Sequence, residues 1–396
     1  MFALTEEQLA YVARVRRLAQ DRLVPLAGDE HDGTVNRALL AEMGRLGLLR
    51  DLFADPQVGG APGDAVAMRL CLLRETIAAV STEAETALAL QGLGGNPIAQ
   101  SGREETARRW LPGVVAGTTV AAFALTEPGA GSDAAALALA AEPDGAGWRL
   151  SGEKIWISNA PEADVYTVFA RTIAGAGARG VTAFAVPGDS PGLAGEHLDM
   201  LSPHPIGRLE FDGVPVGPAD VLGEVDAGFT VAMRTLDLFR PSVGAFALGM
   251  ARAALDAALD HVTRREVYGR PLIDQQAVAH RIADLATLLE SARLLVYAAA
   301  AAYDGGADRH SVTRAAAMAK LHATETAQQV IDAAVQLHGA QGLRRGHLLE
   351  RLYRDVRATR IYEGASEVQR SIIARELTRQ LRKDGPARGD HAGTGR

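Results

Sequence analysis

The chain has 396 residues, of which 47% are hydrophobic and 22% are charged, and its formal net charge is −7. This length suffices for two or three domains, and the composition excludes a disordered or fibrous protein. The negative net charge argues against nucleic acid and against an anionic membrane surface as partners.

Residues 1–117 are predicted to form a helical domain. Apolar residues recur three and four positions apart in five segments: 5–23, 35–46, 64–80, 82–91 and 104–115. A glycine-rich stretch at 59–63 predicts a break between two helices, and the cluster at 92–95 predicts a loop.

Residues 118–225 are predicted to form a β domain. The segments are short, and several are rich in β-branched or aromatic residues: 119–125, 148–150, 154–157, 165–170, 181–186, 197–201 and 207–211. Gly, Pro, Asp and Asn separate them at the spacing typical of an antiparallel barrel or sandwich.

Residues 226–383 return to helical periodicity over longer segments: 229–258, 277–303, 312–338 and 348–381. Helices of this length usually pack in a bundle, and their length suggests that another subunit covers some faces. The tail, 384–396, is predicted to be disordered. The resulting order is multidomain α+β, without the βαβ alternation of a Rossmann fold.

The single cysteine, Cys71, lies in an apolar helical segment. One cysteine excludes a disulfide framework and a cysteine-based zinc site, so a buried free thiol is expected. No metal motif is visible. Thr5-Glu6-Glu7-Gln8 has the form of a capping box, not of a signal peptide. No uncharged apolar run approaches the ~20 residues that cross a bilayer, so we expect a cytoplasmic protein without a membrane segment.

Two segments of the β domain have residues suited to a flat cofactor. The segment 123–133 (FALTEPGAGSD) is a strand followed by a turn rich in small residues. Such a turn exposes backbone N–H groups to a flavin edge or a phosphate, although a plain structural turn has the same composition. In the second segment, Trp156 offers ring contact, and Ser158 lies one strand period away on the same face. A core tryptophan is the alternative.

Two further segments lie in the helical region that follows. Arg265 begins the segment 265–276 (REVYGRPLIDQQ), and a guanidinium suits phosphate, although a solvated helix end is the alternative. Glu363 and Gly364 lie where one helix ends and another begins. A lone glutamate is usually a surface group. Ile361 and Tyr362 favour partial burial, which raises the pKa of a carboxylate and suits it to removing a carbon-bound proton.

These four segments, in this order over about residues 5–381, resemble the acyl-CoA dehydrogenase family. The resemblance implies a helical N-terminal domain, a middle β-barrel-like domain and a C-terminal four-helix bundle. It also implies FAD at a subunit interface of a homotetramer, or less often of a dimer.

The resemblance implies roles for individual residues. FAD would be held by Phe123, Leu125, Thr126, Ser132, Trp156, Ser158, Arg265, Gln276, Gln336, Gly339, Ser366 and Glu367. The thioester would be held by Ser132, Asp237, Phe239, Arg240 and Gly364. Glu363 matches the catalytic base of the short- and medium-chain type, because the position that holds the base in other members is Phe239. It would take the α-proton while the β-hydride passes to flavin N5, giving a 2-enoyl thioester.

Three positions depart from the family pattern. Ala365 replaces a threonine, and the segment 339–342 (GAQG) replaces a paired-glycine loop. The segment 202–207 (SPHPIG) replaces a Gly-x-Arg-x-Ser stretch, which puts the substrate end in doubt and not the flavin end. Phe239 would shorten the acyl pocket and favour a short or compact acyl group.

The sequence leaves several alternatives open. The thioester carrier is either CoA or an acyl carrier protein, and the expected electron acceptor is an electron-transfer flavoprotein, with oxygen as the alternative. A flavin monooxygenase on the same fold is a second hypothesis, which Glu363 argues against. A non-catalytic flavin- or thioester-binding protein is the third, which Trp156, Arg265 and Glu363 make less favourable.

Overall fold

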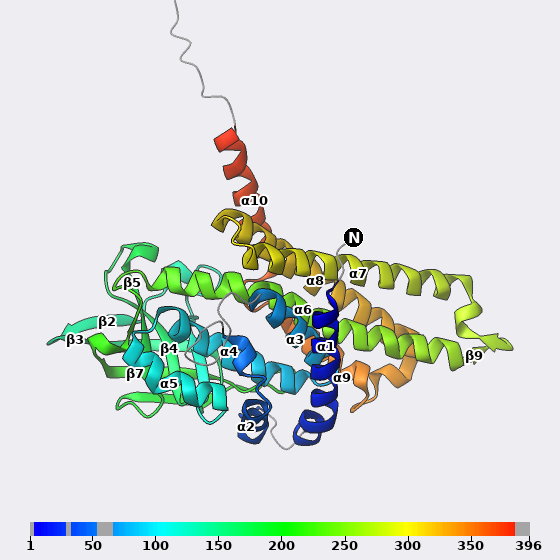
Figure 1. The fold of residues 1–396 in the computed structure, drawn as a ribbon, viewed down its shortest axis with the longest axis horizontal. Coiled ribbons are helices and arrows are strands. Elements are labelled where there is room, and N and C mark those ends of the chain that lie inside the picture. Colours follow the sequence, from blue (N-terminus) through cyan, green and yellow to red (C-terminus); the bar gives the residue numbers. More distant parts are fainter. Residues whose placement is uncertain (1–3, 29–32, 54–65, 385–396) are drawn as a thin grey trace, which may run out of the picture.

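The computed structural model describes residues 4–28, 33–53 and 66–384. The expected break at 59–63 and the tail from 385 onward lie outside these residues. Figure 1 shows an elongated molecule, with the strands at one end and long helices that extend to the other. The predicted order of a helical region, a β domain and a helical bundle is confirmed.

Five helices form the N-terminal region: α1 (Glu6–Leu18), α2 (Arg37–Arg45), α3 (Val66–Ala78), α4 (Thr82–Ser101) and α5 (Glu104–Ala116). The Thr5 hydroxyl accepts from the backbone N–H of Gln8, and the Gln8 side chain accepts from Thr5, which confirms the capping box. Cys71 is fully buried in α3, as expected.

The loop predicted at 92–95 is wrong, because these glycines lie inside α4. A Cβ atom on Gly94 would lie 2.5 Å from the backbone nitrogen of Ala122, and one on Gly95 would meet the ring of Phe53 at 2.9 Å. The glycines therefore allow the helix to approach the first strand closely, and tertiary packing outweighs their low helix propensity.

The β domain contains one eight-stranded sheet. Its strands are β1 (Ala121–Ala124), β2 (Ala140–Asp144), β3 (Gly147–Ser158), β4 (Val165–Arg171), β5 (Val181–Pro187), β6 (Leu193–His197), β7 (Ile206–Val216) and β8 (Val221–Leu222). The order is β6-β7-β3-β2-β4-β5-β8, with β1 parallel to β4.

Three strand predictions need correction. The segments 148–150 and 154–157 belong to the single strand β3, whose pairing with β7 shifts register twice. The strand predicted at 197–201 instead ends at His197, as β6. Strand β2 was missed because its composition, AAEPD, has little β propensity and is held by pairing with β3.

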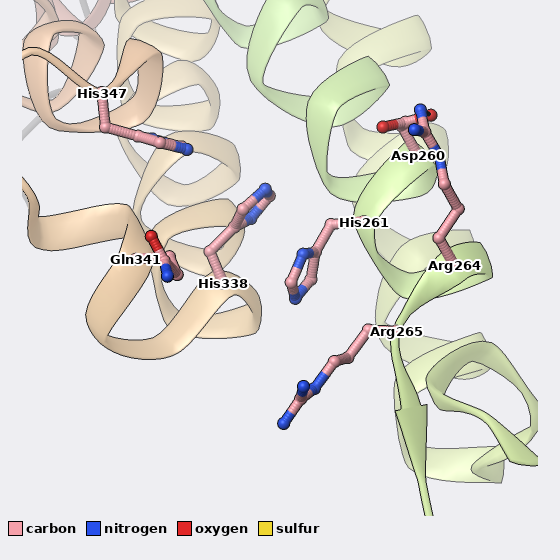
Figure 2. Close-up of a pocket in the computed structure, with 7 residues that line it drawn as sticks. All are labelled: Asp260, His261, Arg264, Arg265, His338, Gln341 and His347. Atoms are coloured by element: carbon pink, nitrogen blue, oxygen red, sulfur yellow. Dashed lines mark hydrogen bonds and ion pairs between the residues drawn. The ribbon is translucent and has the colours of Figure 1, made fainter.

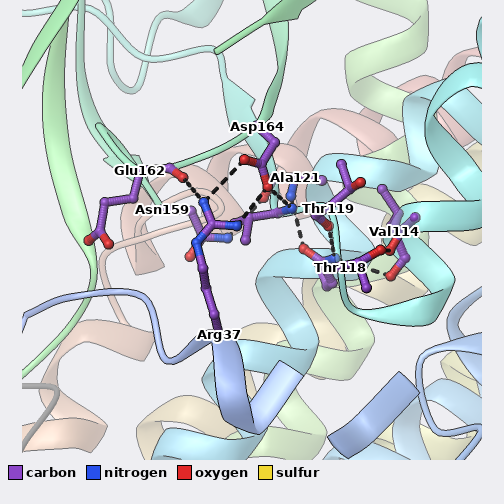
Figure 3. A network of polar contacts seen from close by, with 11 residues as sticks. Arg37, Val114, Thr118, Thr119, Ala121, Asn159, Glu162 and Asp164 are labelled. Carbon is purple, nitrogen blue, oxygen red and sulfur yellow. Dashed lines mark hydrogen bonds and ion pairs between the residues drawn. The ribbon is translucent and has the colours of Figure 1, made fainter. Parts of the chain in front are cut away.

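Arg37 joins the N-terminal helices to the β domain (Figure 3). Its guanidinium donates to the Asp164 carboxylate at 2.9 Å and to the backbone oxygen of Glu162 at 2.8 Å. The same carboxylate accepts from the backbone N–H of Val120 at 2.7 Å, just before β1. This network fixes the start of β1, and thereby the loop that follows it, against α2.

The C-terminal region contains α6 (Gly228–Arg264), α7 (Gln276–Asp304), α8 (Arg309–His338), α9 (Leu348–Thr359) and α10 (Ser366–Asp384). A small hairpin of β9 (Glu266–Val267) and β10 (Arg270–Pro271) lies between α6 and α7. The single helix predicted over 348–381 is wrong. Glu363 and Gly364 have φ angles of +51° and +94°, which end the helical path between α9 and α10.

Two of the described helices, α6 and α7, are long and apolar enough to cross a membrane by length and composition alone. The most apolar stretch of α6 is 72% buried inside the protein, as in the core helix of a globular fold. The corresponding stretch of α7 is only 39% buried. Leu294 and Leu295 of α7 are each 41% exposed. Helix α7 therefore carries an apolar face that the single chain leaves partly uncovered.

Candidate active site

Glu363 lies in the loop between α9 and α10, and side chains from three helices hold that loop. The Glu363 carbonyl accepts from Gln369 at 3.2 Å and from the Arg240 guanidinium at 3.4 Å. The next carbonyl, that of Gly364, accepts from the Lys320 ammonium at 2.8 Å. These bonds satisfy backbone groups that the interrupted helix leaves unpaired, and they fix a glutamate in a left-handed conformation.

The carboxylate of Glu363 has the properties of a base. The residue as a whole is partly exposed, but Oε2 is buried and has no hydrogen-bond partner among the described residues. Burial raises the pKa of Glu363, and the positive charges of Arg74, Lys320 and Arg240 oppose that rise. A desolvated carboxylate with a free oxygen is suited to accepting a proton from carbon.

Helix α6 brings predicted substrate contacts to the same place. The Arg240 guanidinium, which is 5% exposed, lies 3.2 Å from the Asp237 carboxylate, and Thr313 donates to the other Asp237 oxygen at 2.9 Å. Phe239 is fully buried, with its ring against Gly92 of α4. Asp237, Phe239 and Arg240 are thus buried on the helix that reaches Glu363.

A second group of predicted residues lies on the β domain. Trp156 lies at the bulge of β3 with a φ angle of +59°, and 53% of it is exposed. The carbonyl of Thr126 accepts from the backbone N–H of Ile155 at 3.0 Å, so the loop after β1 lies directly beside this strand. An indole held at the surface in a strained conformation is suited to contact with another flat ring.

The loop after β1 is anchored by an ion pair that sequence reasoning missed. The Glu127 carboxylate accepts from the Lys154 ammonium at 2.8 Å and from the backbone N–H groups of Ala138 and Leu139 at 2.6 and 2.9 Å. Both charged side chains are buried, and burial lowers the pKa of Lys154 to about 8. The spacing gives no signal for this pair, because the two residues are 27 positions apart.

Three cofactor residues predicted in this loop differ in exposure. Leu125 is buried, and its carbonyl accepts from Lys154 at 2.9 Å. Phe123 packs on Phe169 with ring centroids 4.9 Å apart. Ser132 is exposed. Leu125 is therefore an interior residue, whereas Ser132 lies at the surface.

His204 is a further residue that the sequence did not assign. Its Nε2 lies 2.8 Å from the Ser158 hydroxyl, and burial lowers its pKa to about 4, so the ring is neutral at physiological pH. His204 belongs to the segment 202–207, which the sequence placed at the substrate end. The structure instead places it on Ser158, one of the predicted flavin contacts. In the sequence, the only indication that His204 is functional was that the segment 202–207 replaces the Gly-x-Arg-x-Ser stretch of the family.

The predicted cofactor residue Arg265 lines an open pocket of about 420 Å³ at the end of the helical bundle. Figure 2 shows Arg265 and His261 on one side, and His338, Gln341 and His347 on the other. The rings of His261 and His338 stack with their centroids 4.2 Å apart. Arg264 and Asp260 complete the lining. Two guanidiniums against one carboxylate make the pocket attractive to phosphate groups.

The remaining predicted cofactor residues lie toward the C-terminal helices. Gln276, Gln336 and Glu367 are exposed, and Gly339 has a φ angle of +59° directly after α8. The Ser366 hydroxyl donates to Glu325 at 2.6 Å. The β domain, which contains Trp156, lies at one end of the molecule, and the β9–β10 hairpin, which follows Arg265, lies at the other (Figure 1).

Comparison with known proteins identifies the family. The chain matches the acyl-CoA dehydrogenase N-terminal domain over residues 5–118, the middle domain over 122–214 and the C-terminal domain over 226–378. The chain belongs to the acyl-CoA dehydrogenase family, and the expected fold is confirmed. It is accordingly an FAD-dependent oxidoreductase, and the exposed Trp156 and the pocket at Arg265 fit the ring and the phosphates of that cofactor.

Three relatives show how far the similarity extends. Cyclohexane-1-carbonyl-CoA dehydrogenase of Geobacter metallireducens is 36% identical over 96% of this chain and 100% of its own. The caffeyl-CoA reductase-Etf complex subunit CarC of Acetobacterium woodii is 37% identical over 89% of this chain and 92% of its own. The butyryl-CoA dehydrogenase structure from Megasphaera elsdenii has a TM-score of 0.88 at 34% identity, covering 96% of this chain and 100% of that one.

Proposed function

We propose that this protein oxidises a short or compact acyl thioester between its α and β carbons, with Glu363 as the base. The observation that carries the proposal is the buried Glu363 oxygen without a partner, beside the charges of Arg240 and Lys320. The relatives whose names specify cyclohexane-1-carbonyl-CoA and butyryl-CoA support a compact acyl group. Phe239, buried in front of Gly92, supports a short pocket.

The residues around the base contribute in distinct ways. Glu363 accepts the α-proton, and its raised pKa reduces the mismatch with a weakly acidic carbon. The cationic side chains of Arg74, Arg240 and Lys320 stabilise negative charge, first on the carboxylate and then on the enolate-like thioester. FAD, when bound, supplies the acceptor for the β-hydride. Asp237 keeps Arg240 in place through their 3.2 Å contact.

We also propose that a second copy of the chain completes the cofactor site. This proposal is supported by the separation of the β domain, which contains Trp156, from the β9–β10 hairpin that follows Arg265 (Figure 1), and by the partly uncovered apolar face of α7 at Leu294 and Leu295. A homotetramer is favoured, because the resemblance implies it. An electron-transfer flavoprotein is the proposed electron acceptor, since the name of the related CarC subunit describes a complex with Etf.

The purified protein tests this function directly. We expect a yellow protein whose visible flavin absorbance bleaches under anaerobic conditions on mixing with short acyl-CoA esters, with the 2-enoyl thioester as product. A second set of assays uses the same acyl groups loaded on an acyl carrier protein. The set that bleaches the flavin faster identifies the thioester carrier. A colourless protein contradicts the proposal, and so does oxygen uptake with a hydroxylated product.

A further inference from the structure

A second buried ion pair lies beside the base, between Arg74 of α3 and Glu85 of α4. Arg74 is 3% exposed and Glu85 is fully buried, and the Arg74 Nε donates to Glu85 Oε1. The guanidinium also donates to the Ser242 hydroxyl at 2.7 Å, and Ser242 donates to the carbonyl of Phe239 at 2.7 Å. The pair is therefore tied to the residue that is predicted to line the acyl pocket.

The pair and the base belong to one electrostatic cluster. Three positive charges oppose the rise in the pKa of Glu363 that burial causes, and the charge of Arg74 has the largest effect of the three. Burial raises the pKa of Glu85 to about 7; Arg74 opposes that shift and the charge of Glu363 adds to it. Helix α6 also links the pair to the base, because Arg74 donates to the Ser242 hydroxyl and Arg240, two residues earlier on α6, donates to the Glu363 carbonyl.

Glu85 has a free oxygen that the dehydrogenation chemistry does not use. Its Oε2 is buried and has no hydrogen-bond partner among the residues that the structure describes. A buried acceptor left without a hydrogen bond destabilises the folded protein. The free oxygen of Glu363 is explained by the α-proton that it accepts, but the free oxygen of Glu85 still requires a donor.

The surrounding charges determine which donor fits. Three cations and three carboxylates make up the cluster around the base: Arg74, Arg240, Lys320, Glu85, Glu363 and Asp237. Because these charges balance, an added carboxylate would be repelled by the carboxylates of Glu85 and Glu363, and an added ammonium would compete with Arg74. A neutral hydroxyl donates one hydrogen bond and leaves the balance unchanged.

We propose that Glu85, oriented by Arg74, binds a hydroxyl group on the acyl chain of the substrate. Hydroxyacyl thioesters are then preferred over alkyl thioesters of the same length, because only they satisfy the free oxygen of Glu85. This inference rests on the proposed dehydrogenase function and names its substrate class.

The test compares short straight-chain acyl-CoA esters with their ω-hydroxy counterparts, above the pKa of Glu85, at about pH 8. For the wild-type protein we expect kcat/KM for flavin reduction to be at least about tenfold higher with the hydroxylated member of the best pair. In the double variant Arg74→Leu/Glu85→Leu the ratio falls to unity or inverts. Both residues are replaced together, because one alone would leave a buried charge unpaired.

A neighbouring pair provides the matched control. Glu75 follows Arg74 in α3 and accepts from Arg293 of α7 at 2.9 Å. The variant Glu75→Leu/Arg293→Leu removes a less buried ion pair elsewhere on α3 and should keep the wild-type ratio. If the Arg74→Leu/Glu85→Leu variant does not fold, the wild-type ratio decides alone.

The outcomes separate this inference from the function on which it rests. A wild-type protein that oxidises alkyl esters as well as or better than hydroxyacyl esters overturns the inference and leaves the dehydrogenase function intact. Faster oxidation of ω-amino than of ω-hydroxy esters overturns the choice of a neutral donor. Absence of bleaching with every thioester overturns the function itself, and the inference with it.

Discussion

Replacement of Glu127 by alanine should destabilise the β domain and weaken FAD retention. The substitution removes the carboxylate that accepts from the backbone N–H groups of Ala138 and Leu139. It also leaves the fully buried ammonium of Lys154 without its counter-charge, so that only the carbonyl of Leu125 still accepts from it. Breaking a buried pair by removing one partner costs about 3–5 kcal/mol. We therefore expect the thermal unfolding midpoint to fall by several degrees.

A double-mutant cycle separates the charge from the lost backbone contacts. Lys154→Met should cost less than Glu127→Ala, because Glu127 keeps its two backbone donors. The double variant should be no less stable than Glu127→Ala alone. The two single costs then exceed the cost of the double variant, and we expect this coupling free energy to be about 1–3 kcal/mol. Unfolding in urea, with and without added FAD, measures these differences. Additive effects, or a cost below about 1 kcal/mol for Glu127→Ala, would refute the role of the pair as the anchor of this loop.

Two further predictions concern the base and the phosphate pocket. Because burial raises the pKa of Glu363 and only the carboxylate accepts a proton, kcat/KM should decline as the pH falls through that raised pKa. If kcat/KM stays constant as the pH falls to the ordinary pKa of a glutamate side chain, this prediction is contradicted. Arg265→Ala should weaken FAD binding at least about tenfold, measured by titration of the apoprotein, through loss of a charged phosphate contact. Riboflavin, which lacks phosphates, serves as the control ligand, and its affinity should stay unchanged.

The periodicity of the sequence predicted the order of the domains and most helices, because each helix buries one apolar stripe. It failed where tertiary contacts outweigh local preference. Gly94 lies inside a helix because a strand passes against it, and β2 pairs despite its alanines and proline. The helical segment expected over 348–381 is divided at Glu363 and Gly364, where the glycine had indicated a helix end and where positive φ angles separate α9 from α10.

The candidate site shows the same division. Glu363 was predicted because its apolar neighbours Ile361 and Tyr362 favour burial and because it matches the position of the base in the family that the sequence resembles. Arg74, Glu85 and Lys320 were not, since each resembles an ordinary charged residue of an amphipathic helix. Only the packing of α3, α4 and α8 around the loop buries them together beside the base. His204 was likewise visible only as a departure from the family pattern.

The most direct test of the account is anaerobic single-turnover reduction of the flavin in the Glu363→Gln variant. Glutamine keeps the shape of the side chain but cannot accept the proton. We expect a yellow, folded protein that still binds the thioester and whose flavin bleaches at least about 10²–10⁴-fold more slowly than in the wild type. Reduction at the wild-type rate by the same thioester would show that another group removes the α-proton.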